Sequence, residues 1–470
     1  MDLTPSMGRL ERLCRRYAPD GGRSGFTLVS TGLEAFLTLH GLTVAAERTL
    51  DVQYYLWEND GSGRRLLAAL LDAADRGVRV RLLLDDIGAP SSDPELARLD
   101  AYPNVEVRLY NPFPRRFGLI LGVLFQSRRV SRRMHNKAFV ADRAAAVVGG
   151  RNVGDRYFEF DAHANFRDLD LFAAGPVVEQ VAASFDAFWD SEWSRPIGVI
   201  DRGRWRLADV RSTVRRGLRR RLQREGKGPY PASEGLRRRS YRALVEQRFA
   251  NLIVAEDAAV LVDRPDKPRS GEPRLLETLL ARLDRSPEAE LLLESAYFVP
   301  ARRGVALFSR LARSGVAVRV LTNSAGSGEV AVAHAAYRKY RRPLLRVGVE
   351  LYELRADAGA GAWQLNLHTK AAVIDRREVF VGSLNVDPRS AVLNTEIALL
   401  VRSPALAARV AAFIEDGMGP AKAYRPVLDA GRLGWQVAGD PNVHRAEPGV
   451  SLWRLTLLRL LALLPLDRVV

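Results

Sequence analysis

The chain has 470 residues, enough to bury two full hydrophobic cores, and its formal net charge is +16. This basic excess favours a polyanionic partner such as a phospholipid surface, a nucleic acid or a phosphorylated substrate, and it does not choose among them. Cys14 is the only cysteine, so the composition excludes an intrachain disulfide and a cysteine-based metal cluster and fits a reducing cytosol.

The first half of the chain has the pattern of a β-α-β unit. Residues 26–49 carry apolar side chains at helical spacing and predict an amphipathic helix. A buried strand over 49–57, a helix over 64–76 and a second strand over 77–86 are expected next, with a third strand over 105–109. The order of strand, helix, glycine turn and strand predicts parallel pairing with a right-handed crossover.

The second half repeats this order, with strands expected over 291–299, 315–322 and 349–354 and a helix over 304–313. Each half is therefore expected to be an α/β domain. The predicted organisation is an N-terminal extension (1–25), a first domain (26–200), a basic linker (201–245), a second domain (246–440) and an amphipathic C-terminal tail (441–470).

The segment between the halves, residues 202–242, is rich in arginine, and its composition predicts either a linker or a pair of basic helices. A solvated charged segment and a patch for lipid headgroups are equally compatible with it. Each basic residue near an anionic surface adds roughly 1 kcal/mol to lipid binding.

Two other stretches have the composition of membrane-contacting segments. Residues 117–125 are apolar, too short to span a bilayer and bracketed by arginines, which suits an interfacial anchor; an ordinary buried helix is the alternative. The leucine-rich stretch 451–466 is compatible with docking on protein or on lipid. No apolar run reaches about 18 residues, and residues 1–24 lack the apolar core of a signal peptide, so we expect peripheral membrane contact.

A histidine, a lysine, an aspartate and an asparagine occur at the same offsets in both halves. The two sets are His135, Lys137, Asp142 and Asn152, and His368, Lys370, Asp375 and Asn385. A single HxKxxxxD match arises by chance at on the order of one in ten thousand positions, so two copies indicate a repeated chemical unit. Only six lysines occur in an arginine-rich chain, and the two in these motifs indicate a need for a compact ammonium.

The motif places basic and nucleophilic groups together. Residues two apart on a strand point to the same face, so each histidine is expected to share a pocket with its lysine. If the halves face each other about a pseudo-twofold axis, one pocket holds two imidazoles and two ammoniums. These groups supply a nucleophile, a general acid and fixed positive charge, as a metal-free phosphodiester transfer requires.

The remaining motif residues have supporting roles in this hypothesis. Asn152 and Asn385 would add neutral donors to the phosphate oxygens, and neighbouring glycines would permit close backbone approach. Asp142 and Asp375 complete the catalytic motif but lie an odd number of positions from the histidines. This parity places them off the catalytic face, and we interpret them as turn or ion-pair residues.

A nucleophilic imidazole needs its second nitrogen held by a carboxylate. Alignment of 166–171 with 394–399 pairs Asp168 with Glu396, which we predict to be the orienting acids; Asp170 is the competing candidate.

Two other interpretations of the motif histidines are disfavoured. A metal site is unfavourable because the His-x-Lys spacing places an ammonium where a cation would bind. A structural core histidine is the default for one isolated copy, but it does not explain two copies with matched lysines. That default applies to the other histidines, His40, His163, His334 and His444.

The duplicated HxKxxxxD motif resembles the signature of the phospholipase D superfamily. The resemblance extends to the bacterial cardiolipin synthases of the C type and covers nearly the whole chain after about residue 25. The stretches that carry it are Arg133–Lys137, Gly149–Phe158, Asp51–Trp57, Tyr297–Pro300 and Asp387–Ser390.

The resemblance implies a pair of phospholipase D-like α/β/α sandwich domains related by a pseudo-twofold axis. It further implies a ping-pong phosphatidyl transfer through a phosphohistidine, with no cofactor. His135 would be the nucleophile, and His368 would protonate the leaving alcohol and then deprotonate the glycerol of phosphatidylglycerol to give cardiolipin. The near symmetry of the halves leaves the reverse assignment open.

Four more residues are expected to contact the substrate. Tyr54 and Tyr297 belong to the matched strands of the two halves. Ser383 and Gly150 occupy equivalent positions, each two residues before the motif asparagine, so the second half has a hydroxyl that the first lacks. We expect this asymmetry to distinguish the roles of the two halves.

The expected partners are phosphatidylglycerol, with phosphatidylethanolamine as a candidate donor, an anionic membrane surface, and a helper protein as a further candidate. The expected location is peripheral, on the cytoplasmic side of the inner membrane. A phospholipase D-type hydrolase or a nuclease of the same superfamily is the alternative function, since the charge favours it equally. A non-catalytic membrane-binding scaffold is disfavoured by the two intact His–Lys pairs.

Overall fold

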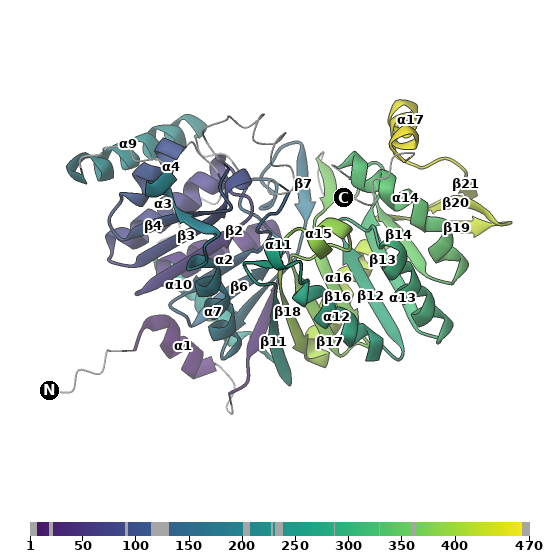
Figure 1. The fold of residues 1–470 in the computed structure, drawn as a ribbon, viewed down its shortest axis with the longest axis horizontal. Coiled ribbons are helices and arrows are strands. Elements are labelled where there is room, and N and C mark those ends of the chain that lie inside the picture. The colour runs from purple at the N-terminus through teal and green to yellow at the C-terminus, as the bar shows by residue number, and fades with distance from the viewer. Residues whose placement is uncertain are drawn as a thin grey trace.

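The structure is a computed structural model. It describes residues 7–17, 22–89, 93–113, 131–200, 207–226, 229–230, 238–285, 287–328, 330–359 and 363–462. Within these ranges the chain forms two large sheets flanked by helices, arranged side by side in two lobes (Figure 1). The apolar stretch 117–125 lies outside the described residues.

The first sheet has nine strands among the described residues. In sheet order they are β10 (Ile253–Val254), β1 (Gly25–Val29), β8 (Asp170–Ala174), β6 (Ala145–Gly149), β5 (Ala138–Ala141), β2 (Thr49–Tyr54), β3 (Arg79–Asp85), β4 (Val105–Tyr110) and β9 (Ser194–Pro196). The helices of this half are α1 (Arg9–Tyr17), α2 (Gly32–Ala45), α3 (Gly61–Asp75), η1 (Asp86–Gly88), α4 (Asp93–Asp100), α7 (Val177–Trp189), α8 (Ile197–Ile200), α9 (Leu207–Glu225) and α10 (Arg238–Ala250).

The second sheet has ten strands within the described ranges. They are β11 (Asp257–Val262), β18 (Ile397–Arg402), β17 (Glu378–Gly382), β16 (Lys370–Ile374), β12 (Glu290–Ser295), β13 (Ala317–Asn323), β14 (Glu350–Leu354), β19 (Ala423–Asp429), β20 (Arg432–Val437) and β21 (Asp440–His444). Its helices are α11 (Lys267–Ser270), α12 (Arg274–Arg285), α13 (Ala301–Arg313), α14 (Ala331–Arg346), α15 (Pro388–Val392), α16 (Pro404–Met418) and α17 (Leu452–Leu461).

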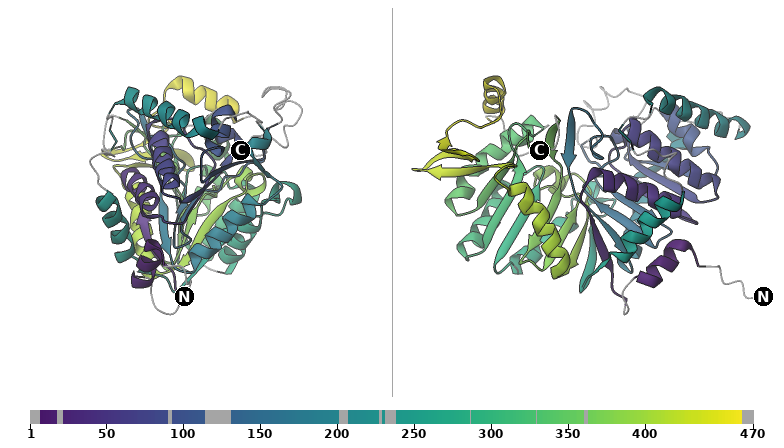
Figure 2. Two further views of the ribbon diagram at one scale, coloured as in Figure 1. Left: turned by 90° about the vertical axis from the view of Figure 1, so that its left-hand side faces the viewer. Right: turned by 180° about the vertical axis from the view of Figure 1, so that it is seen from behind.

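The two sheets have the same strand order. The series β1-β8-β6-β5-β2-β3-β4 corresponds to β11-β18-β17-β16-β12-β13-β14. In each series the last three strands pair in parallel and the others pair antiparallel. Helices cover both faces of each sheet (Figures 1 and 2), so the predicted pair of α/β/α sandwiches is confirmed.

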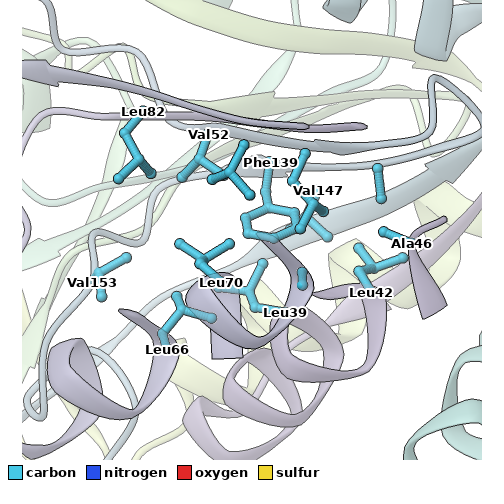
Figure 3. Packing of buried hydrophobic residues seen from close by; sticks show 14 of the residues in the cluster. Leu39, Leu42, Ala46, Val52, Leu66, Leu70, Leu82, Phe139, Val147 and Val153 are labelled. Carbon is cyan, nitrogen blue, oxygen red and sulfur yellow. The ribbon is translucent and has the colours of Figure 1, made fainter. Parts of the chain in front are cut away.

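The outer core of the first domain lies between its sheet and the helices α2 and α3. Figure 3 shows Leu39, Leu42, Leu66 and Leu70 of these helices packed against Val52, Leu82, Phe139 and Val147 of the sheet. A second core lies between the domains, where α7 and α16 contribute to one apolar cluster with strands of both sheets. Because this cluster is continuous, the two domains bury their inner faces together.

The prediction of an amphipathic helix over 26–49 was wrong in its first part. Residues 25–29 form β1, which pairs with β8 and β10. A short apolar run has no periodicity that separates strand from helix, and here the sheet partners decide. The helix α2 begins after Thr31, whose hydroxyl accepts a hydrogen bond from the Glu34 amide. Most of α2 is buried because α10 covers its outer side.

The predicted basic linker is a helix pair packed on the first domain. The helix α9 lies on α3 and α4, and α10 lies on α2. Arg215 of α9 forms ion pairs of 2.7 Å with Asp72 and 2.5 Å with Asp75 of α3. The buried face of α9 carries Val210 and Leu218. The apolar face of this arginine-rich segment therefore belongs to the domain, which composition alone did not indicate.

The C-terminal tail is partly integrated into the second domain. Strand β21 crosses the boundary expected at residue 441 and extends the sheet. Glu447 accepts from Arg341 of α14 at 2.6 Å and lies 3.1 Å from His334. These contacts account for His334 as a structural residue.

Helix α17 packs on α14 through Leu455 and Leu458. It leaves Trp453, Leu457 and Leu460 exposed. Among the described residues, no helix is long and apolar enough to cross a membrane.

The backbones of the two domains contact each other at two equivalent places. Strands β7 (Ala164–Arg167) and β15 (Gln364–Leu367) pair in parallel across the boundary. The symmetric contact is an isolated bridge between Met134 and Thr395. Each of these segments leads directly into a motif histidine or its predicted acid, so the domain contact also builds the site.

Candidate active site

The motif segments lie at the carboxyl ends of the parallel strands, where the two domains meet. His135 and Lys137 precede β5 and are not part of it, contrary to the expected strand, and Lys370 opens β16. The His135 amide donates to the Thr395 carbonyl at 2.9 Å, and the His368 amide donates to the Arg167 carbonyl at 2.8 Å. Each histidine is thus held by the backbone of the opposite domain.

Each motif histidine also faces an acid from the opposite domain. His135 Nδ1 lies 2.8 Å from Glu396 Oε2, and His368 Nδ1 lies 2.6 Å from Asp168 Oδ2. Both carboxylates are fully buried, and the side chains of both histidines are 10% exposed. A carboxylate at Nδ1 holds the proton there and leaves the Nε2 lone pair available.

Both imidazoles are neutral near pH 7. Burial lowers the pKa of His135 to about 4, and the carboxylate of Glu396 offsets this only in part. Burial and the neighbouring Lys370 lower the pKa of His368 to about 3. A neutral imidazole with a free Nε2 is the form that a nucleophile or a general base requires.

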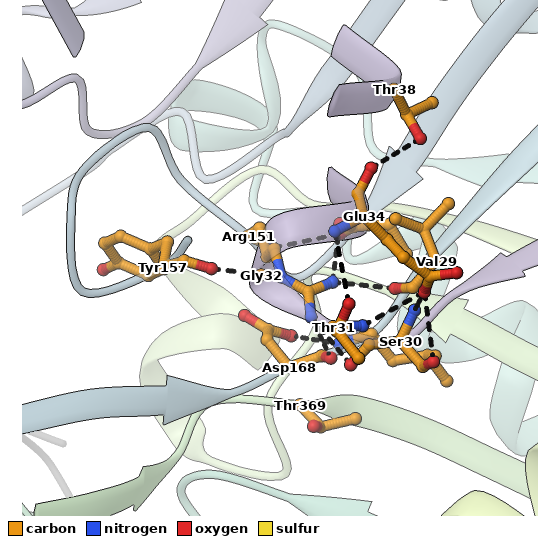
Figure 4. Close-up of polar contacts among 12 residues, drawn as sticks. Val29, Ser30, Thr31, Gly32, Glu34, Thr38, Arg151, Tyr157, Asp168 and Thr369 are labelled. Carbon is orange, nitrogen blue, oxygen red and sulfur yellow. Dashed lines mark hydrogen bonds and ion pairs between the residues drawn. The ribbon is translucent and has the colours of Figure 1, made fainter. Parts of the chain in front are cut away.

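Asp168 and not Asp170 contacts the histidine. The side chain of Asp170 forms an ion pair with Arg151 at 2.9 Å. Arg151 also donates to the carbonyls of Val29 at 2.8 Å and Asp168 at 2.6 Å, and Figure 4 shows its guanidinium among these groups. Arg151 therefore fixes the backbone that carries Asp168.

The two motif lysines are buried beside their histidines. Lys137 Nζ donates to the His135 carbonyl at 2.7 Å, and Lys370 Nζ donates to the His368 carbonyl. Burial lowers the pKa of Lys137, and it lowers the pKa of Lys370 to about 8. The centre thus holds two ammoniums against two carboxylates, and an anionic ligand would strengthen the protonation of both lysines.

Ser383 and Gly150 lie behind the histidines, so the expectation that they contact substrate was wrong. The hydroxyl of Ser383 donates to Glu396 Oε2 and accepts from the Ile397 amide at 3.0 Å. A β-carbon at position 150 would lie 2.1 Å from Asp168 Oδ1. The serine therefore supports the acid of His135, and the glycine makes room for the acid of His368.

Aromatic side chains surround the two imidazoles. Tyr55 lies 5.1 Å from the His135 ring, and Tyr157 and Phe166 each lie 5.1 Å from the His368 ring, measured between ring centroids. Burial raises the pKa of Tyr297 to about 12, with further contributions from Asp387 and Tyr55. Contact of Tyr297 with the substrate stays a prediction.

The expectation for Tyr54 was wrong, because this side chain is in the core of the first domain beside Trp57. The strand register explains this result. Ala138 and Ala371 are equivalent, since each follows its motif lysine. Gln53 pairs with Ala138 and Glu294 pairs with Ala371, so the next residues, Tyr54 and Ser295, correspond to each other. Tyr54 therefore does not correspond to Tyr297.

The motif asparagines are both buried near these rings. Asn152 Nδ2 donates to the Tyr157 hydroxyl at 2.9 Å, and Asn152 Oδ1 accepts from the Leu56 amide at 3.3 Å. Asn385 Oδ1 has no hydrogen-bond partner among the described residues. A buried unsatisfied amide oxygen is costly, and a ligand hydroxyl is the kind of donor that would satisfy it.

Asp142 and Asp375 lie at the opposite end of the sheet, roughly 20 Å along the strand from the histidines. Each occupies a left-handed position, with φ of +51°, in the turn between two antiparallel strands. Asp142 accepts from the amides of Glu47, Arg48 and Thr49 at 2.7–2.9 Å. Asp375 accepts from the amides of residues 288–290 at 2.8–2.9 Å.

Sequence reasoning missed several residues that position the site. Arg133 is fully buried and lies 3.1 Å from Asp85, which also accepts from the Met134 amide at 2.8 Å. Lys267 and Asp263 form a buried ion pair of 2.7 Å, and Asp263 accepts from the Glu396 amide. The sequence signal that could have indicated these residues is Arg133 beside the motif, because a buried arginine needs an acidic partner.

Within the described part of the chain, no three His, Cys, Asp or Glu side chains are grouped to hold a metal.

Two carboxylate-held imidazoles and two buried ammoniums at the joint of two equal α/β domains define a phospholipase D-like site. The chain matches the family described as cardiolipin synthase, PLD-like domain, over residues 42–189 and 279–416. It is 39% identical to cardiolipin synthase C of Escherichia coli K12, with 97% of both chains covered. The chain therefore belongs to the cardiolipin synthase family of the phospholipase D superfamily.

One further curated protein and one solved structure are similar to this chain. The chain is 25% identical to cardiolipin synthase B of Escherichia coli K12, with 76% of this chain and 71% of that protein covered. The crystal structure of phosphatidylserine synthase from Haemophilus influenzae Rd KW20 has the same fold, with a TM-score of 0.62 at 14% identity and 98% of both chains covered.

We predict that Asp142→Ala and Asp375→Ala each lower the free energy of unfolding by about 2–4 kcal/mol, because three backbone amides lose a charged acceptor. Urea denaturation would measure this loss, with Asp257→Ala at an exposed position as the control. Turnover per folded molecule should stay within about twofold, since both residues are far from the histidines. A lost turnover with unchanged stability would show that these aspartates act in catalysis.

We predict that the site binds sulfate more weakly as the pH rises through about 8. Below this pH the Lys370 ammonium is protonated and attracts the anion, whereas above it the charge is lost. Calorimetry should give an affinity that falls by up to about tenfold per pH unit above this value. Lys370→Met should bind weakly at every pH, and a flat profile for the unaltered protein would exclude this role.

Proposed function

We propose that this protein is a cardiolipin synthase that transfers a phosphatidyl group to phosphatidylglycerol through a phosphohistidine. The observation that carries the proposal is the crossed pairing of His135 with Glu396 and of His368 with Asp168. It supplies two neutral imidazoles in one pocket with two ammoniums, and membership of the cardiolipin synthase family supports the choice of lipid as substrate.

In the first step, Nε2 of His135 attacks the phosphorus of the donor phospholipid. A phosphorus–nitrogen bond forms, the bond from phosphorus to the headgroup oxygen breaks, and His368 gives a proton to the departing alcohol. For this His368 must be protonated. Burial and then the charge of Lys370 are the main causes of the low pKa of His368. A bound phosphodiester anion offsets the charge of Lys370 and so favours the protonated form of His368.

In the second step, His368 takes the proton from the terminal glycerol hydroxyl of phosphatidylglycerol. The resulting oxygen attacks phosphorus, the bond to His135 breaks, and cardiolipin leaves. Lys137, Lys370 and the amides of Asn152 and Asn385 would stabilise the non-bridging oxygens in both steps. The donor in this proposal is phosphatidylglycerol or phosphatidylethanolamine.

Ser383 supports the assignment of the nucleophile to His135. Its hydroxyl donates to Glu396, and this second hydrogen bond helps keep that carboxylate ionised and fixed. A phosphohistidine carries positive charge on its ring while the phosphorus–nitrogen bond exists, so a firmly held carboxylate favours the intermediate on His135. Asp168 has no equivalent hydroxyl, because Gly150 occupies that place.

The proposal includes peripheral association with the cytoplasmic face of the inner membrane. The net charge of +16 supports attraction to anionic lipid. The exposed apolar face of α17 supports contact with the bilayer interface.

We predict that the purified protein forms cardiolipin from phosphatidylglycerol vesicles, with and without phosphatidylethanolamine, and keeps its activity in a metal chelator. Lipid chromatography would identify the product, and the assay contains no other protein, so it also tests the need for a helper. Release of phosphatidic acid alone would identify a hydrolase. Cleavage of DNA without lipid turnover would overturn the proposal.

We predict that His135→Ala abolishes both cardiolipin formation and a covalent phosphatidyl-enzyme, with activity below about one thousandth of the original. His368→Ala should retain the nucleophile and let the covalent species accumulate or form slowly. Radiolabelled donor lipid and acid-quenched protein would measure it. Accumulation in the His135 variant instead would exchange the two roles.

A further inference from the structure

A cavity of about 280 Å³ lies beneath the basic helix α9, outside the reactive centre. Its floor is made by Leu82 and Leu84 of β3, and its walls by Leu67 of α3, Leu96 and Leu99 of α4 and Leu218 of α9. The volume is nearly twice that of a cavity of about 150 Å³ that holds benzene and near the lower limit of ligand pockets. The lining is thus suited to a hydrocarbon group.

A glycine in α9 lines this cavity. Gly217 lines it, and a β-carbon at this position would meet no atom within 4 Å. Its backbone is helical, so no turn requires glycine, although glycine costs about 1 kcal/mol relative to alanine inside a helix. A small side chain is therefore accommodated at position 217, whereas a bulky one would occupy the groove.

The cavity is separated from the reactive centre by one short segment. Tyr55 faces the His135 ring, and Trp57, two residues further on, lines the cavity. Trp57 and Glu58 lie against the segment that follows Asn152, where the Glu58 amide donates to the Val153 carbonyl at 2.8 Å. The segment 55–58 thus contacts the reactive centre at Tyr55 and the cavity at Trp57 and Glu58.

The mouth of the cavity is lined by charged residues of both signs. Arg64, Arg98 and Arg221 line it with Glu58 and Glu95; Arg221 forms an ion pair with Glu95, and Arg64 forms one with Glu225. The outer side of α9 carries exposed arginines at helical spacing, at positions 216, 219, 220 and 224. Burial and the nearby Asp60 raise the pKa of Glu58 to about 7, which reduces the negative charge at this rim. The exposed arginines on the outer side of α9 attract an anionic bilayer.

The position of the cavity fits a bilayer on the same side of the molecule. Helices α9 and α17 both lie along the upper edge of the molecule in Figure 1 and in the left view of Figure 2. The exposed Trp453, Leu457 and Leu460 of α17 are side chains that enter the membrane interface. A bilayer that contacts α17 would therefore lie on the side of the molecule that carries α9.

We propose that the groove between α3, α4 and α9 binds an acyl chain of the anionic phospholipid substrate. The apolar lining takes the chain, and the exposed arginines on the outer side of α9 attract the anionic lipid surface. This deepens and rests on the proposed function, since it defines how the enzyme would select a long-chain lipid. Gly217 lines the groove, so a bulky side chain at this position would reduce the space available for the chain.

Photolabelling tests the proposal without depending on turnover. The full chain is mixed with phosphatidylglycerol vesicles whose acyl chains carry a diazirine, irradiated, digested and mapped by mass spectrometry. We expect label on α3, α4 and α9. Gly217→Phe should reduce it by at least about fivefold by filling the groove, and Gly217→Ala should leave it within about twofold. Thermal unfolding should show that both variants fold, since each replaces a helical glycine.

Kinetics with the same variants give the second readout. Gly217→Phe should raise the KM for long-chain phosphatidylglycerol by at least about threefold, with kcat and the turnover of a dihexanoyl lipid within about twofold. Label placed elsewhere, or undiminished in Gly217→Phe, would overturn the groove. Label on the groove in a protein that makes no cardiolipin from either lipid would instead overturn the proposed function and leave the groove intact.

Discussion

Two hydrogen bonds that cross between the domains, from His135 to Glu396 and from His368 to Asp168, are the constraint on which the site depends. Each domain supplies one histidine and one acid, but neither supplies a matched pair. A buried imidazole without its carboxylate has no fixed tautomer, so a single domain has an incomplete centre. The strand pairing of β7 with β15 and the common apolar core bring the two halves into register for these contacts.

The fold of the two halves repeats more closely than the side chains around the two histidines do. Strand order, backbone contacts and both His–Lys pairs repeat, but Glu396 has a serine hydroxyl where Asp168 has only a glycine. The longer side chain of Glu396 accepts a hydrogen bond from Ser383, while the shorter side chain of Asp168 lies against Gly150. This difference is a physical basis for the unequal tasks proposed for the two imidazoles, in which one holds the phosphoryl group and the other moves protons.

Much of this arrangement could be predicted from the sequence, because it depends on local spacing. The repeated motif identified both histidines and lysines, and alignment of the halves found Asp168 and Glu396. The crossing of the acids between domains could not be predicted, since it depends on how the two sheets face each other. For the same reason, the basic segment 202–242 gave no sign that α9 and α10 pack on the first domain.

The errors at the level of single residues also have physical causes. Tyr54 and Tyr297 belong to matched segments of the two halves, but β2 ends at Tyr54 and β12 ends at Ser295, so the two tyrosines do not occupy equivalent positions. The apolar run at 26–29 resembles a buried helix as much as a strand, and only its sheet partners separate the two. Ser383 was assigned to substrate because its hydroxyl is next to the motif, whereas in three dimensions it faces Glu396.

The apolar cluster shared by both sheets has a consequence for how the reaction begins. Strand β10 follows α10 and pairs with β1 before the chain enters the second sheet at β11, so the domains are joined by paired strand and core packing. Such a joint has little freedom to hinge. The imidazoles, acids and ammoniums are consequently preorganised before a lipid arrives, and binding energy is not spent on bringing the domains together.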